Sequence, residues 1–291
     1  SCMMLAMFFM LLPQAQGSAE RINAVLDRKA SIREGSVQTG AETGTVEFRN
    51  VSFRYPHASG DALTNIDFKV NRGETLAIIG ATGSGKTTLV QLIPRFYDAT
   101  EGAVLIDGVN VKDYSFDALY DKLGYVTQKA VLFSGTVRDN VLFGESAAGS
   151  DSENLESAIA LSQAKEFVDK LPEGTNYEIE QLGRNVSGGQ KQRLSIARAL
   201  ARKPEILVFD DSFSALDYRT DAKLREGLNR ELHDVTKIIV AQRISTIRHA
   251  EKILVLDRGE IVGMGTHDEL MQFCKVYREI ATSQLSAAEL A

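Results

Sequence analysis

The chain of 291 residues contains no tryptophan, only two cysteines and only four histidines. Cys2 and Cys274 lie at opposite ends, so the sequence offers neither a disulfide framework nor the spacing of a zinc site. The net charge is −6, so no excess of positive charge favours nucleic acid as a partner. Internal repeats and low-complexity tracts are also absent. These absences are typical of a globular protein in a reducing compartment. The length allows one large or two modest domains.

The most apolar run lies at the start, where residues 2–12 are apolar on every side. The run is shorter than the about 20 residues that span a bilayer, and no basic residues precede it as in a signal peptide. It could be the cut end of a transmembrane helix, a buried core helix or an interfacial anchor. We favour the first, because residues 14–26 continue with the periodicity of a helix that leaves the membrane for the cytosol. Residues 1–34 are therefore expected to be the end of a truncated transmembrane helix with a cytosolic extension.

A change of composition follows, because residues 35–44 are rich in Gly, Thr and Ser. Such a segment is typical of a linker, so a second domain is expected over residues 45–291. Short apolar strands alternate with helical patterns along that domain, which indicates an α/β fold.

Residues 80–87, with the sequence GATGSGKT, fit the phosphate-loop pattern G-x-x-x-x-G-K-[ST]. An apolar run typical of a buried strand precedes them and a helical run follows. The glycines let successive backbone N–H groups turn toward a phosphate. We therefore predict a nucleoside triphosphate site, with Lys86 on the β- and γ-phosphates and the Thr87 hydroxyl on Mg²⁺. The residues predicted to hold the phosphates are Gly80, Thr82, Gly83, Ser84, Gly85, Lys86, Thr87 and Thr88.

Two more segments carry the chemistry of ion binding. Ser187, Gly188 and Gly189 open a helix, so a hydroxyl and free N–H groups form a second anion site, although an ordinary N-cap has the same pattern. The apolar residues 206–209 run directly into Asp210 and Asp211. A carboxylate at the C-terminal end of a parallel strand, beside a phosphate loop, holds Mg²⁺ and its waters.

The order of these motifs resembles the nucleotide-binding domain of ABC transporters. The resemblance rests on the phosphate loop, Gln128, the SGGQ segment at 187–190, Asp210 and the SALD segment at 214–217. Segments 132–141 and 18–22 resemble the exporter branch of the family. The resemblance implies a P-loop NTPase (RecA-like) α/β core, with an antiparallel β subdomain and an α-helical signature subdomain at about residues 129–202.

The resemblance also implies roles for individual residues. Tyr55 would stack on adenine, although a tyrosine at a strand end is also ordinary core filler. Gln128 would touch Mg²⁺ and the attacking water, so the implied metal ligands are Thr87, Gln128 and Asp210. Two such domains would sandwich two ATP molecules head to tail, each closed by the partner's signature. The signature of this chain consists of Ser187, Gly188, Gly189 and Gln190.

The implied setting is a cell membrane, with this domain on the cytoplasmic side and a second ABC half-transporter as partner. The chain's own membrane domain would be missing from the sequence, and no nucleic acid partner is expected. ATP and Mg²⁺ are the implied cofactors.

Three positions depart from the family pattern. Asp211 stands where the family usually has Glu; it is one methylene shorter, so its carboxylate falls ~1–1.5 Å short, a displacement that costs about 100-fold in rate. Gln242 stands where His is usual; it still donates a hydrogen bond but cannot become cationic. Gln181 replaces a usual Glu, with no assigned effect. The first two changes together resemble the weakened subunit of heterodimeric exporters, so the catalytic residues Asp211, Gln242 and Gln128 are expected to hydrolyse ATP slowly.

Other functions stay open. A homodimeric exporter could hydrolyse adequately with Asp211, and a neighbouring gene for a second half-transporter would argue against it. A soluble ABC protein acting on ribosomes or DNA is disfavoured by the apolar start and the acidic balance. A non-hydrolysing ATP-binding scaffold would be separated from a slow enzyme by single-turnover kinetics. The transported substrate is not encoded in these residues.

Overall fold

The computed structural model describes residues 2–144 and 151–284 and divides the chain into two units, Ser1–Arg33 and Glu34–Ala291. The first unit contains helix α1 (Cys2–Leu26), which continues through Pro13 and has no buried residue. In the described part of the chain, α1 is the one helix whose length and apolar composition would let it cross a membrane. The apolar face of α1 therefore finds no core within these residues.

Deleting residues 1–12 should leave the melting temperature of the second unit nearly unchanged and should improve solubility. The reason is that α1 buries none of its residues, so the deletion removes no core packing. Differential scanning fluorimetry of the truncated and complete chains would measure the effect. A fall of more than about 5 °C, the size of a lost core contact in a modest domain, would instead make this segment part of the core.

The second unit is built on a six-stranded sheet in the order β12-β11-β3-β10-β9-β6. Five of its strands run parallel, and β12 pairs antiparallel with β11 at one edge. The inner strands are short apolar runs that are buried on both faces, as a covered parallel sheet requires. The strands are β3 (Thr75–Ile79), β6 (Leu123–Val126), β9 (Ile206–Asp210), β10 (Thr236–Val240), β11 (Lys252–Asp257) and β12 (Glu260–Gly265).

Alternate residues of this sheet enter two separate cores. Ala77 and Ile79 of β3 join a core with the helices, whereas Leu76 and Ile78 join a core with a second sheet. The other inner strands follow the same two-residue period, which fixes their register: a slip by one residue would exchange the two faces.

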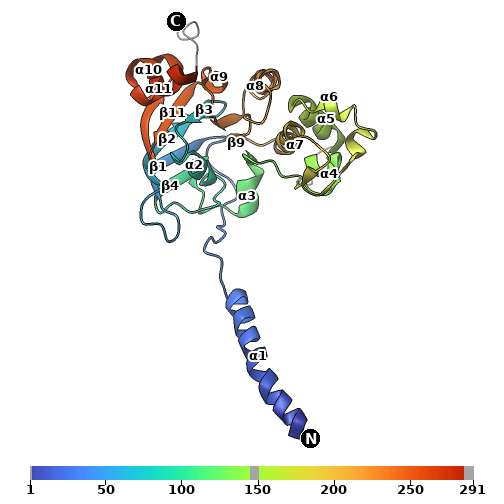
Figure 1. Ribbon diagram of the computed structural model, residues 1–291. Helices are drawn as coiled ribbons and strands as arrows, with labels where there is room; N and C mark the ends of the chain where they lie inside the picture. Colours follow the sequence, from blue (N-terminus) through green and yellow to red (C-terminus); the bar gives the residue numbers. More distant parts are fainter. Residues whose placement is uncertain (1, 145–150, 285–291) are drawn as a thin grey trace. The chain divides into compact units, whose positions relative to one another are not determined.

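The second sheet is antiparallel and packs on one of these cores. Its order is β2-β1-β4-β5, and the stacked rings of Phe48 on β1 and Phe68 on β2, 4.6 Å apart, belong to that core. Figure 1 shows β1 and β4 of this sheet beside α2 (Lys86–Gln91). The strands are β1 (Val46–Phe53), β2 (Leu63–Val70), β4 (Glu101–Ile106) and β5 (Val109–Asn110).

A group of helices gathers on one side of this unit, away from α10 and α11, as Figure 1 shows. The group includes α4 (Val137–Val141), α5 (Asp151–Leu161), α6 (Lys165–Val168) and α7 (Gly188–Ala201), with the small sheet of β7 (Gly135–Thr136) and β8 (Glu178–Ile179). The remaining helices are α2 (Lys86–Gln91), α3 (Phe116–Asp121), α8 (Tyr218–Glu231), α9 (Ile244–Ile247), α10 (His267–Phe273) and α11 (Lys275–Gln284).

The segment expected to be a linker is fastened to the second unit. The backbone N–H of Gly35 donates to the carbonyl of Tyr114, and those of Ser36 and Val37 donate to Asp113, each at 2.9 Å. The Glu34 carboxylate accepts from the N–H of Phe116 at 3.1 Å, at the start of α3. Gly35 therefore serves close backbone approach: a Cβ at this position would lie 2.1 Å from the Asp113 carbonyl oxygen.

Candidate active site

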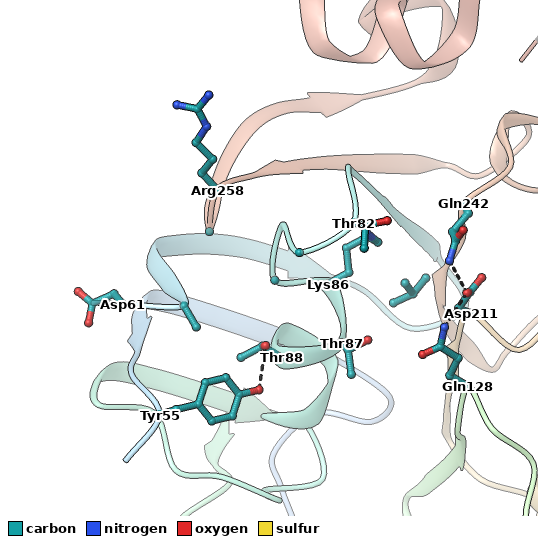
Figure 2. Close-up of a pocket in the computed structure, with 15 residues that line it drawn as sticks. Tyr55, Asp61, Thr82, Lys86, Thr87, Thr88, Gln128, Asp211, Gln242 and Arg258 are labelled. Carbon is teal, nitrogen blue, oxygen red and sulfur yellow. Dashed lines mark hydrogen bonds between the residues drawn. The ribbon is translucent and has the colours of Figure 1, made fainter. Parts of the chain in front are cut away.

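A cavity of about 630 Å³ opens beside the C-terminal ends of β3, β9 and β10. Side chains from several separate segments line it, and Figure 2 shows ten of them labelled. The lining residues are Tyr55, Asp61, Ala62, Thr82, Gly83, Gly85, Lys86, Thr87, Thr88, Gln128, Asp211, Val240, Gln242, Arg258 and Gly259. The strands β3, β6, β9 and β10 run parallel, so the residues that follow them meet at this edge of the sheet. The rest of the lining comes from the connection between β1 and β2 and from the turn between β11 and β12.

The phosphate loop joins β3 to α2, and its glycines are needed for two different reasons. Gly85 has φ 104°, a left-handed conformation that other residues adopt only with strain. Gly80 lies against a neighbouring strand, where a Cβ would be 2.0 Å from the carbonyl oxygen of Leu256. A larger residue at either glycine would therefore disturb the backbone conformation of the phosphate loop.

Lys86 lies at the first position of α2 and lines the cavity. Its ammonium donates to the carbonyls of Gly80 and Ala81, both at 2.8 Å. Burial lowers the pKa of Lys86, and the carboxylates of Asp211 and Asp210 oppose that shift. The positive charge of Lys86 thus lies inside the phosphate loop, where it would form charge-assisted hydrogen bonds with phosphate oxygens.

Tyr55 reaches the cavity from the end of β1. Its hydroxyl lies 2.9 Å from Oγ1 of Thr88 on α2, as Figure 2 shows, and its ring meets Phe53 and Tyr97 edge to face. The ring is half-buried and faces the cavity, so it both fills the rim of the core and offers a surface for an aromatic base.

Asp210 ends β9 and is almost completely buried. Its Oδ1 accepts from the Thr87 hydroxyl at 3.0 Å and its Oδ2 accepts from the Tyr125 hydroxyl at 3.4 Å. Burial raises the pKa of Asp210, an effect that these two donors oppose and the neighbouring Asp211 charge reinforces. A carboxylate and a hydroxyl in contact are hard oxygen ligands of the kind that Mg²⁺ prefers.

Asp211 brings the three predicted catalytic residues together. Its Oδ2 accepts from Nε2 of Gln128 at 3.0 Å and from Nε2 of Gln242 at 2.6 Å. Figure 2 shows the carboxylate between the two amides. The backbone of Asp211 has φ 48°, and its N–H donates to the Val240 carbonyl on the neighbouring strand. Aspartate tolerates this left-handed conformation better than most residues.

The Ser-Gly-Gly-Gln segment lies outside the cavity. Ser187 is the N-cap of α7: its hydroxyl accepts from the N–H of Gln190 at 3.3 Å, and Oε1 of Gln190 accepts from the N–H of Ser187 at 2.8 Å. This reciprocal pair is a capping box. Within one chain the segment therefore has the ordinary N-cap arrangement, with Ser187 and Gly188 exposed.

The sequence motifs gave no sign of the wall that Asp61, Ala62, Arg258 and Gly259 form. The turn at Arg258 and Gly259 joins β11 to β12, and the N–H of Gly259 donates to the Ser84 carbonyl of the phosphate loop at 3.0 Å. The hairpin itself is predictable from its turn, but its place beside β3 depends on a parallel pairing between distant segments. The contact of Tyr125 with Asp210 was missed for the same reason.

Known proteins resemble this chain in sequence and in fold. The profile of the ABC transporter family matches residues 63–214, just over half of the chain. The chain belongs to the ABC transporter family. The match includes the phosphate loop, Gln128, the Ser-Gly-Gly-Gln segment and both aspartates.

Individual relatives extend the likeness over nearly the whole chain. An uncharacterized ABC transporter ATP-binding protein, YfiB of Bacillus subtilis, is 43% identical over 281 residues, which are 97% of this chain and 48% of YfiB. A putative multidrug export ATP-binding/permease protein, YgaD of the same species, is 44% identical over 241 residues, 83% of this chain and 41% of YgaD. The chain thus spans about half the length of the curated relatives it matches.

A solved structure gives the same result in three dimensions. The structure of a bacterial Atm1-family ABC exporter with ATP bound matches with a TM-score of 0.89 and 32% sequence identity, over 97% of this chain and 50% of the exporter. The predicted α/β P-loop NTPase fold and the prediction of an exporter-type, ATP-binding ABC ATPase domain are therefore confirmed. The likeness to exporters also associates the chain with membranes. The roles of single site residues stay predictions.

Proposed function

We propose that this chain is the ATP-hydrolysing part of a longer ABC exporter, which drives export across a cell membrane when two such domains close around ATP. The observation that carries the proposal is the separation of the two anion sites. The phosphate loop lines the cavity, whereas the signature at residues 187–190 lies outside it and begins with the exposed Ser187 and Gly188. A second domain is thus needed to bring a signature over the ATP of this chain.

The N-terminal unit supports a membrane setting. α1 is long and apolar enough to cross a bilayer and buries no residue in the described structure. YgaD is named as an ATP-binding/permease protein, and the stretch that this chain matches is 41% of its length. We therefore assign α1 to the end of a membrane helix, with the second unit on the cytoplasmic side.

Magnesium would be held by Thr87, Asp210 and Gln128. The hydroxyl and carboxylate already lie 3.0 Å apart, and their oxygens fit the cation. Among the described residues, no group of three or more His, Cys, Asp and Glu side chains could hold a metal alone. Oxygens of the nucleotide would therefore complete the coordination, and the cation would neutralise charge on the phosphates.

We further propose that the site of this chain is hydrolytically weak and that its partner is a different half-transporter. Asp211 is shorter than the glutamate usual in the family, and two neutral amides both donate to its Oδ2. Gln242 is one of those amides and carries no charge at any pH. The signature has no such departure, so this chain would complete the partner's site while its own ATP turns over slowly.

Ser187→Arg should abolish ATP turnover of the assembled full-length pair, because the arginine would block closure over the ATP of the partner. Phosphate release from the purified pair in detergent would measure it. Ser187→Ala removes the same N-cap, at a cost of about 1 kcal/mol, without added bulk, and should keep more turnover. Ser157→Arg places the same side chain at an exposed serine of α5 and serves as the control. If Ser187→Arg keeps full turnover, the active site does not use this signature and the asymmetric assembly is wrong.

A further inference from the structure

Gln284 of α11 holds the loop that carries Gln242. Its Nε2 donates to the backbone carbonyl of Gln242 at 2.8 Å, and its Oε1 accepts from the backbone N–H of Ile244 at 2.9 Å. One side chain therefore forms two hydrogen bonds to the backbone of the loop, although Gln284 lies 40 residues after Ile244 in the sequence. A primary amide suits this task because it has a donor and an acceptor on the same rigid group.

The position of Gln284 is fixed by the packing of its helix. Tyr277 and Ala281 are completely buried, and the Tyr277 hydroxyl lies 2.8 Å from Nδ1 of His267 on α10. Spacings of four and three residues put Tyr277, Ala281 and Gln284 on the same helical face. The burial of Tyr277 and Ala281 therefore orients the helix so that Gln284 faces the loop that carries Gln242.

The loop depends on this contact, because the start of α9 has no cap of its own. Arg243, at the N-cap position, makes no side-chain hydrogen bond to the helix. Gln284 supplies an acceptor for the N–H of Ile244, the first residue of α9. Its other contact fixes the carbonyl of Gln242, whose side chain donates to Asp211 at 2.6 Å. Gln284 and Asp211 are thus linked through Gln242, which bonds the first with its backbone carbonyl and the second with its side-chain amide.

We infer that Gln284 is a positioning residue for Gln242, which sets where the Gln242 amide meets the Asp211 carboxylate. The inference rests on the proposed roles of Gln242 and Asp211 in hydrolysis. Gln284 does not line the nucleotide cavity. Its loss is therefore expected to act on turnover and to leave ATP binding alone.

The test measures kcat and KM for ATP of the full-length protein in detergent. Where a second half-transporter co-purifies, its phosphate-loop lysine is replaced by alanine so that hydrolysis reports the site of this chain. Gln284→Ala should lower kcat about 3- to 10-fold through a sub-ångström displacement and change KM less than about twofold. In a Gln242→Ala background the same change should have no further effect on kcat, because its target is gone.

Gln284→Glu separates positioning from capping. The glutamate still accepts from Ile244, and its charge suits a helix start, so α9 and the melting temperature should be kept. It has no donor for the Gln242 carbonyl, so kcat should fall as it does for the alanine variant. Ser283→Ala is the matched control: among the described residues, the hydroxyl of this exposed neighbour donates to Ile280 of its own helix, and its loss should change nothing.

Three results would overturn the inference: an unchanged kcat in Gln284→Ala, full rescue by Gln284→Glu, or an equal loss of kcat with and without Gln242. If Gln284→Glu kept the kcat of the unchanged protein, Gln284 would act only as the cap of α9. Lys86→Ala shows whether a negative result concerns the positioning role of Gln284 or the proposed function itself. If Lys86→Ala abolishes turnover while Gln284→Ala does not lower it, only the positioning role fails. If Lys86→Ala keeps turnover, the proposed site itself is wrong.

Discussion

Lys86→Ala should weaken ATP binding by at least about tenfold and reduce turnover by at least about 100-fold, because the ammonium is the cation inside the phosphate loop. The structure holds this ammonium on the carbonyls of Gly80 and Ala81, within the lining of the cavity. Titration calorimetry would give the affinity for ATP, and phosphate release would give the turnover.

Lys170→Ala provides the control for Lys86→Ala. Lys170 is also a lysine, but it is exposed and forms a surface ion pair with Glu166, so its loss should alter neither quantity. Equal nucleotide affinity in Lys86→Ala and the unchanged protein would mean that ATP does not bind at this loop.

Asp211→Glu together with Gln242→His should raise hydrolysis at the site of this chain by up to about 100-fold, provided that the facing signature works. The added methylene extends the carboxylate, and the histidine replaces a neutral amide by a group that becomes cationic. Turnover should then also gain a pH dependence near the ordinary pKa of histidine, about 6.5, which a glutamine cannot give. Phosphate release across pH 5.5–8, a range chosen about that value, would measure both effects.

The single changes show which departure limits the rate. Asp211→Glu alone should give most of the gain, because it alone moves the carboxylate. Asp211→Asn has nearly the same size without the charge, so it should lose the residual turnover. A double variant that is no faster than the unchanged protein would remove the physical basis of the weakened site, and a partner of a different kind would no longer be implied.

Local chemistry was enough to predict many of the individual strands and helices. The GATGSGKT segment defines its own strand, loop and helix, because glycine backbone freedom and a buried apolar run act over a few residues. The strand that ends in Asp210 and Asp211 was predictable for the same reason. The helix that begins after Ser187 has its cap in its own sequence, which the structure shows as a capping box.

Other features were not local and could not be predicted. Residues 35–44 have the composition of a linker, yet hydrogen bonds tie part of the segment to Asp113 and Tyr114 about 75 residues away. The wall at Arg258 and Gly259 likewise depends on the pairing of β11 with β3. Long-range pairing depends on the balance of the whole core, so composition carries little information about it.

By itself, the sequence determined which groups the candidate site contains: a phosphate loop with Lys86 and Thr87, two carboxylates at a strand end, and two glutamines. Each is set by residue type and by neighbours close in the chain. Only the tertiary structure decided how those groups meet. It placed the amides of Gln128 and Gln242 on the same oxygen of Asp211 and brought Gln284 to the loop behind them. The physical reason is that hydrogen bonds act over about 3 Å in space, and the packing of distant segments alone sets which polar atoms come within that reach.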